Sequence, residues 1–135
     1  MFEYSTLVRV RYAETDQMGF VYYGHYAAYY EVARVESLRS LGLTYRSLEE
    51  EGILMPVVEN KSKYIRPGRY DDLLRIQVRI DEMPHKRIKF NYEVFNEAGE
   101  LINVGETLLA FVDRKSGKTC AAPGQIADVL KRFFD

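Results

Sequence analysis

The sequence predicts a single α+β domain in which an antiparallel five-stranded sheet wraps around one long central helix. Three observations support this: a helical segment that is apolar or small nearly all round, several segments in which apolar and polar residues alternate, and an order of elements that does not alternate helix with strand. A chain of 135 residues with 47% hydrophobic composition can bury one core, so we expect residues 1–135 to form one domain.

The first half of the chain is expected to contain one strand, one turn and the long helix. Apolar and polar residues alternate over 6–12, which is typical of a strand with one wetter face. A turn is expected over 15–19 and the helix over 23–41, with Gly42 at its C-terminal cap. Because little of the helix surface is polar, we expect it to be buried almost all round.

The second half is expected to consist mainly of strands. A short helix with Thr44 as its N-cap precedes them, and Pro123 opens a final short helix. The last strand alternates weakly, which is typical of a central strand that is buried on both faces. Between the two helices, four extended segments are expected to follow one another as a meander, over 53–65, 74–81, 88–94 and 101–112.

The charge balance and the absence of targeting patterns narrow the classes of function. The 19 basic and 20 acidic residues are interspersed and give a net charge of −1, which argues against a general nucleic-acid binder. The sequence shows no signal peptide and no apolar stretch long enough to span a bilayer, so we expect a cytoplasmic protein without stable membrane insertion. One cysteine and two histidines show no ligand spacing, so no metal site is predicted.

The segment over 12–26, YAETDQMGFVYYGHY, is the most informative stretch for function. It joins the first strand to the long helix and places one acid, Asp16, in a turn with Gly19. Backbone N–H groups at the start of a helix lack intrahelical acceptors and can polarise a carbonyl group. A carboxylate beside them can attack that carbonyl or activate water, so the segment predicts a hydrolytic site.

Several short motifs along most of the chain point to one family. They are Arg9-Val10, Thr15-Asp16, Gly19, Val21-Tyr22-Tyr23, Tyr26, the helical segment Tyr30-Glu31-Val32-Ala33-Arg34, and Arg66-Pro67 with Tyr70-Asp71-Asp72. With these residues the chain resembles the hotdog-fold acyl-CoA thioesterases of the 4-hydroxybenzoyl-CoA thioesterase type. The resemblance implies a hotdog fold, hydrolysis of an acyl-CoA or acyl-carrier-protein thioester without a cofactor, and a homodimer or a homotetramer built as a dimer of dimers.

The resemblance also implies roles for individual residues. Asp16 is expected to be the catalytic carboxylate, as nucleophile or general base, while a backbone N–H near Tyr23 or Gly24 polarises the thioester carbonyl. His25 is a further catalytic candidate that can orient water, bind the leaving thiolate or steer Asp16; the alternative is a first-turn residue that hydrogen-bonds locally. Substrate contacts are expected from the rest of the motif and from a basic loop: Gly19, Val21, Tyr22, Gly24, Tyr26, Lys63 and Arg66.

Two departures from the family pattern keep other functions open. Many relatives carry His where Tyr23 stands and Asn where His25 stands. A hotdog dehydratase acting on hydroxyacyl thioesters needs a His general base, which His25 would supply. A non-catalytic acyl-thioester binding module would keep the pocket without turnover. Asp16 and Gly19 favour the thioesterase over both alternatives.

The remaining charged residues are interpreted from their surroundings. Glu14 is expected to be solvated. Glu31 lies in a helix that we expect to be buried, so it is expected to pair with Arg34 one turn later. Basic residues cluster before the third strand, where they either hold the phosphates of CoA or form an ordinary solvated face. They are Lys61, Lys63, Arg66 and Arg69.

Overall fold

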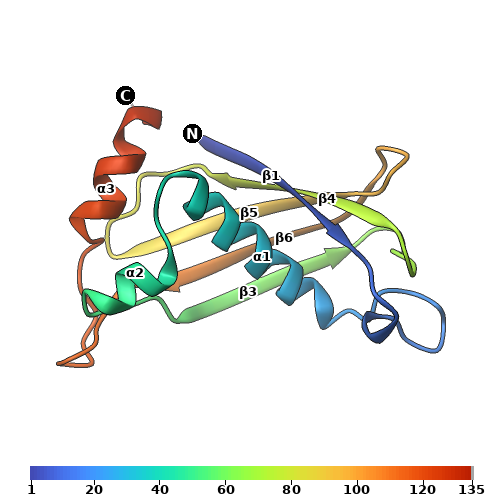
Figure 1. Cartoon of the computed structure of the whole chain (residues 1–135), viewed down its shortest axis with the longest axis horizontal. Coiled ribbons are helices and arrows are strands. Elements are labelled where there is room, and N and C mark those ends of the chain that lie inside the picture. Colours follow the sequence, from blue (N-terminus) through green and yellow to red (C-terminus); the bar gives the residue numbers. More distant parts are fainter. Residues whose placement is uncertain (135) are drawn as a thin grey trace.

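A five-stranded antiparallel sheet with α1 (His25–Ser40) lying across one face forms the body of the molecule (Figure 1). The computed structural model describes residues 1–134. The strand order across the sheet is β1-β4-β5-β6-β3. These strands are β1 (Phe2–Arg9), β3 (Val57–Tyr64), β4 (Leu73–Ile80), β5 (Arg87–Phe95) and β6 (Leu101–Ala110).

Smaller elements close the end of the sheet away from the start of α1. β2 (Ile53–Leu54) pairs with β7 (Val112–Asp113) as a separate two-stranded sheet. α2 (Tyr45–Glu50) and α3 (Gly124–Leu130) lie at this same end in Figure 1. The predicted N-cap of α2 is confirmed, because the Thr44 hydroxyl accepts the Ser47 N–H at 2.9 Å.

The core lies between α1 and one face of the sheet. β4 and β5 alternate between buried and more exposed residues, as their period-two pattern predicts. Burying an apolar side chain of this size stabilises the fold by roughly 1.5–3 kcal/mol. The inward-facing side chains of these two strands are Leu74, Ile76, Val78, Ile80, Ile88, Phe90, Tyr92 and Val94, all almost completely buried.

Two predicted strand assignments are corrected by the structure. The first strand runs from Phe2 to Arg9 rather than over 6–12, because its whole length pairs with β4. The predicted four-strand meander is wrong at its first connection, because the first extended segment does not pair with the second. β4, β5 and β6 do form a meander, but β3 pairs with β6 and is an edge strand. The expected segment over 53–65 is divided into β2 and β3, with Pro56 between them.

The predicted helix bounds and burial are also corrected. α1 begins at His25 rather than at residue 23 and ends at Ser40, and Gly42 follows with φ +84°. The helix is not buried all round, because the sheet covers only one side of it. Its uncovered side exposes small, apolar and charged residues together, namely Ala27, Ala28, Glu31 and Val32. Among residues 1–134, the structure contains no helix that is both long and apolar enough to cross a membrane.

Buried tyrosines connect α1 to the sheet. The Tyr30 ring stacks on Tyr92 with the centroids 4.1 Å apart and the planes inclined by 2°. The Tyr30 hydroxyl hydrogen-bonds Ser62 of β3 at 2.8 Å and donates to the Asn103 side chain of β6. It lies directly against Gly105, where an added Cβ would collide with the Tyr30 side chain. Packing and hydrogen bonding therefore account for the tyrosine at position 30.

Candidate active site

A tight turn after β1 fixes the orientation of Asp16. The Asp16 Oδ1 atom accepts the backbone N–H of Met18 at 2.9 Å and that of Phe20 at 3.2 Å. Gly19 allows the turn because its φ of +80° is unfavourable for other residues. No hydrogen bond to Oδ2 occurs within residues 1–134. One oxygen of the carboxylate thus holds the loop, and the other is available for chemistry.

The start of α1 offers unpaired backbone donors near this carboxylate. The Tyr22 N–H donates to the Glu14 carbonyl at 2.8 Å, and the His25 N–H donates to the Tyr22 carbonyl at 2.9 Å. Between them, the N–H groups of Tyr23 and Gly24 have no backbone or side-chain acceptor in the part of the chain that the structure describes. Such groups at a helix start carry partial positive charge and favour an oxyanion.

Asp16 and Tyr23 border one largely apolar pocket of about 330 Å³. The turn and the helix start form one side of the pocket, and the segment from the end of β3 to Pro67 forms the other. The predicted residues that line it are Asp16, Val21, Tyr23, Tyr26 and Arg66. A free carboxylate oxygen, aromatic walls and a basic side chain in one pocket suit an acyl group that is joined to a charged carrier.

The loop after β3 holds the far side of this pocket in place. The Val21 N–H donates to the Gly68 carbonyl at 2.8 Å. A Cβ on Gly68 would come within 3.0 Å of the Val21 side chain and 3.3 Å of the Tyr26 hydroxyl, so glycine permits the close approach. Burial raises the pKa of Tyr26 to about 12, against a hydrogen bond from the Gly68 backbone that lowers it. Tyr26 is therefore a neutral hydroxyl at physiological pH.

Glu14 is buried, which corrects the expectation that it is solvated. Its carboxylate accepts the Arg11 backbone N–H at 2.9 Å, the Arg11 guanidinium at 2.8 and 3.0 Å, and the Tyr29 hydroxyl at 3.0 Å. Burial raises the pKa of Glu14, but these hydrogen bonds outweigh it and hold the pKa below its usual value. Because Tyr29 belongs to α1, Glu14 ties the loop that carries Asp16 to the helix that follows the unpaired donors.

The chain matches a known family along almost its whole length. A family model described as the thioesterase-like superfamily covers residues 10–133. The chain belongs to this superfamily. The predicted resemblance to hotdog-fold thioesterases is therefore confirmed, and the motif around Asp16 lies inside the matched region.

Proteins that are named as thioesterases or thioester hydrolases are similar to most of the chain. The acyl-CoA thioester hydrolase YbgC of Escherichia coli is 35% identical over 125 residues, which is 93% of each protein. The putative acyl-CoA thioesterase YneP of Bacillus subtilis is 35% identical over 111 residues, or 82% of this chain and 80% of that protein. A DHNA-CoA thioesterase from Staphylococcus aureus superposes with a TM-score of 0.86 at 33% identity, over 99% of this chain and 85% of that one.

Several predicted site residues lie at the edge of this pocket or outside it. The His25 ring packs edge-on against Tyr22 at 6.0 Å between centroids, and neither side chain lines the pocket. Tyr22 is 44% exposed and its ring lies 4.6 Å from that of Tyr23. Gly24 is confined by Tyr22, whose ring would lie 2.9 Å from an added Cβ. The structure thus brings Asp16 and Tyr23 to one pocket, whereas the His25 ring packs on Tyr22, which precedes the helix.

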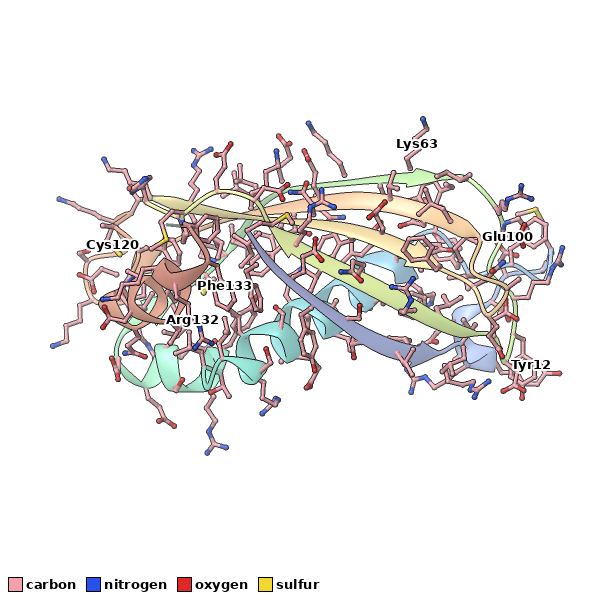
Figure 2. The ribbon with its side chains drawn as sticks, turned by 90° about the horizontal axis from the view of Figure 1, so that it is seen from above. Tyr12, Lys63, Glu100, Cys120, Arg132 and Phe133 are labelled. Atoms are coloured by element: carbon pink, nitrogen blue, oxygen red, sulfur yellow. The ribbon has the colours of Figure 1, made fainter. Side chains whose placement is uncertain are left out.

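The basic cluster expected near the third strand is divided between two faces. Lys61 pairs with Glu59 and Glu106 on the sheet face opposite α1. Lys63 lines a separate hollow on that same face, and Figure 2 shows it projecting from β3 away from α1. Only Arg66 lines the Asp16 pocket, where it also forms an exposed ion pair with a glutamate at 3.5 Å. Within one chain, Lys63 and Arg66 therefore do not share a site.

The predicted pairing of Glu31 with Arg34 is wrong. Glu31 is exposed and forms no ion pair within residues 1–134, whereas Arg34 is buried and donates to hydroxyl groups. The helical spacing placed the two residues one turn apart, but Arg34 points toward the sheet. Its hydroxyl partners lie up to 73 residues away in the chain, so no local sequence signal reveals them.

Proposed function

We propose that the protein hydrolyses an acyl-CoA, or acyl-carrier-protein, thioester to a free acid and a thiol. The observation that carries the proposal is one pocket bordered by the free Oδ2 atom of Asp16 and by the helix start with its unpaired N–H groups. The names of similar proteins support the same reaction, since they include acyl-CoA thioester hydrolases and a DHNA-CoA thioesterase.

The thioester carbonyl is polarised by the backbone at the start of α1. Its oxygen accepts the N–H of Tyr23 or Gly24, whose hydrogen bonds strengthen as negative charge develops on that oxygen. No side chain has to move for this to occur, because the donors are fixed by the hydrogen bonds of Tyr22 and His25 on either side of them. Removing one such donor typically costs about 10²–10³ in turnover.

Asp16 supplies the other half of the reaction. In one route its Oδ2 atom attacks the carbonyl carbon, expels the thiolate and forms a mixed anhydride that water then hydrolyses. In the other route Oδ2 removes a proton from water as the water oxygen attacks the same carbon. Both routes consume one water and release one carboxylic acid and one thiol. A single turnover in ¹⁸O-labelled water separates the general-base route from an anhydride that water opens at the Asp16 carbonyl. In that anhydride route the acid carries no label and Asp16 gains one ¹⁸O, whereas the general-base route places one ¹⁸O in the acid.

The dehydratase alternative receives no support from the placement of His25. A dehydratase base must reach the α-carbon of the acyl group in the pocket, but the His25 ring packs against Tyr22 and does not line the pocket. We retain His25 as a residue that orients the helix start, with a smaller effect on turnover than Asp16.

Two copies of the chain are proposed to form the working unit, alone or as half of a tetramer. β3 ends the sheet, and its free edge presents hydrophobic side chains that a monomer would leave in water. Val57, Val58 and Tyr64 are 52%, 49% and 51% exposed. Joining the β3 edges of two copies would cover these side chains.

The decisive experiment measures thiol release from short-chain, long-chain and aromatic acyl-CoAs by wild type and Asp16→Ala. Turnover by the wild type that is lost in a folded Asp16→Ala protein supports the proposal. Asp128→Ala is the matched control, because Asp128 is exposed on α3. Equal turnover by wild type and Asp16→Ala contradicts the assigned role of the carboxylate.

Substitution of two basic residues tests whether they bind the charged part of CoA. If Arg66 binds the phosphates of CoA, Arg66→Gln raises KM for an acyl-CoA but leaves KM for the matching acyl-pantetheine, which lacks the nucleotide, unchanged. The same comparison for Lys63→Gln tests whether Lys63 binds carrier in the assembled protein, since its side chain faces away from α1 in one chain. Equal KM shifts for both thioesters would show that these side chains do not recognise the nucleotide.

A further inference from the structure

Arg34 is a buried cation with no anionic partner among residues 1–134. It is 5% exposed. Its Nε atom donates to the Tyr45 hydroxyl at 3.1 Å, and its Nη1 atom donates to the hydroxyls of Tyr92 at 3.0 Å and Thr107 at 3.3 Å. All three acceptors are neutral, and no hydrogen bond from Nη2 occurs within residues 1–134. Buried charges are ordinarily neutralised by a partner, so this arrangement is incomplete in one copy.

The uncovered side of Arg34 opens onto a hollow between α1 and the sheet edge. The hollow measures about 310 Å³ and lies between the first three turns of α1, the edge strand β3, and Thr107 of β6. At Ala27 and Ala28 the helix wall of the hollow carries only methyl side chains. The strand wall is formed by Val57 and Asn60. Small helix residues allow another backbone to approach closely, so a second helix can pack against this wall.

The hollow also has an acid at its rim. Glu31 lines it and is exposed, and in residues 1–134 its carboxylate forms neither an ion pair nor a hydrogen bond. We propose that in a two-fold pair of chains the Glu31 carboxylate of each copy enters the hollow of the other and binds the Arg34 guanidinium there. The occupant of the hollow is thus a second copy of this chain.

Symmetry makes this pairing reciprocal. Glu31 and Arg34 are one turn apart on the same helix, so two α1 helices that pass each other antiparallel about a two-fold axis form the contact twice. The open edge of β3 borders the same hollow through Val57 and Asn60, so one axis serves both the joined sheet edges and the paired helices. The inference rests on the proposed two-copy unit and adds the residues that select its register.

Reversing the exposed charge tests the pair without disturbing the core. Glu31→Arg places two cations at each contact, and we expect the dimer dissociation constant from sedimentation velocity to rise by at least about tenfold. Glu36→Arg is the control: Glu36 lies on the same helix but outside the hollow and is only paired with Arg39 at the surface. A dimer of unchanged affinity in Glu31→Arg, or a monomeric wild type at all concentrations, overturns the proposal.

A complementation experiment separates contacts between copies from contacts within one. Arg34→Glu alone places two anions at each contact, but mixed with Glu31→Arg it gives a heterodimer in which both contacts join opposite charges. We expect each variant to be mainly monomeric alone and the mixture to form a one-to-one dimer. Folded variants that fail to associate when mixed contradict the proposal. If Arg34→Glu does not fold, as judged by circular dichroism, the Glu31→Arg result decides.

The assembly readout is independent of the chemistry. A wild-type dimer that needs Glu31 but releases no thiol from any thioester would refute the proposed function and leave this inference standing. An active protein whose dimer does not depend on Glu31 would refute this inference and leave the proposed function standing.

Discussion

Glu14 and Asp16 are two carboxylates two residues apart, yet their surroundings differ, and so do the roles that we propose for them. Glu14 is 6% exposed, and both of its oxygens are occupied by donors from Arg11 and Tyr29. Asp16 uses one oxygen for the backbone of its own turn and leaves the other unbonded beside a pocket. A carboxylate whose oxygens are all bonded stabilises a loop, whereas one with a free oxygen beside unpaired backbone donors can react.

The largest effect is expected from Asp16→Asn. The amide keeps an oxygen for the N–H groups of Met18 and Phe20, so the turn should remain, with the free energy of unfolding changed by about 0.5 kcal/mol or less. It cannot act as nucleophile or base, so kcat/KM for thiol release should fall by about 10²–10⁴. Steady-state kinetics and urea unfolding on the same preparation check both halves. If Asp16→Asn lost stability but kept its turnover, Asp16 would have the structural role and not the reacting one.

The second effect is expected from Glu14→Gln. The neutral amide loses the charge-assisted hydrogen bonds from Arg11 and turns a donor toward a site built for an acceptor. We expect the free energy of unfolding to fall by about 1–3 kcal/mol, with a much smaller loss of kcat than in Asp16→Asn. Glu50→Gln, which breaks an exposed helical pair with Arg46, is the control for loss of a surface charge. A loss of kcat equal to that of Asp16→Asn in a stable Glu14→Gln protein would make Glu14 a reacting group.

The dependence of stability on pH gives a further test of the role of Glu14. The pKa of Glu14 in the fold lies below its ordinary value of 4.5, because the hydrogen bonds from Arg11 and Tyr29 outweigh burial. The unfolded chain therefore binds a proton more readily, and the contribution of Glu14 to stability is complete above about pH 4.5 and is lost as the pH falls through the lowered pKa. The urea midpoints of wild type and Glu14→Gln should converge below pH 4.5. If the difference between the two urea midpoints widens as the pH falls, the pKa of Glu14 is raised in the fold rather than lowered.

The smallest effect is expected from Tyr29→Phe. It removes one donor to Glu14 and leaves the Arg11 contacts, so the free energy of unfolding should fall by about 0.5–1.5 kcal/mol with little change in kcat. Tyr12→Phe is the matched control, because Tyr12 is 76% exposed and its hydroxyl makes no hydrogen bond within residues 1–134. Equal losses in the two variants would mean that the Tyr29 hydroxyl does not support Glu14.

Local signals in the sequence predicted the elements that local interactions determine. The N-cap at Thr44, the glycine after α1 and the alternation in β4 and β5 each depend on residues a few positions apart. The turn at Asp16 and Gly19 is of the same kind, since its hydrogen bonds span two to four residues.

Interactions between distant segments account for the errors. Nothing near Glu14 indicates that Tyr29 of α1 will cover it, and nothing near Arg34 indicates that Tyr92 and Thr107 will receive its hydrogen bonds. The edge position of β3 likewise depends on which strand β6 joins, and strand alternation does not encode that choice. The direction of His25 is set by its packing on Tyr22, a contact that the sequence spacing allows but does not require.

The contact of Tyr30 with Gly105 constrains how this sequence can diverge. A methyl group at position 105 has no space while the tyrosine is present, and a smaller residue at position 30 leaves a void over a bare backbone. An added Cβ at position 105 would also lie 2.7 Å from the backbone oxygen of Lys61, so a smaller residue at position 30 does not by itself make room for it. Glycine is therefore fixed at position 105 by the neighbouring strand as well as by the tyrosine, and the two positions cannot exchange bulk with each other.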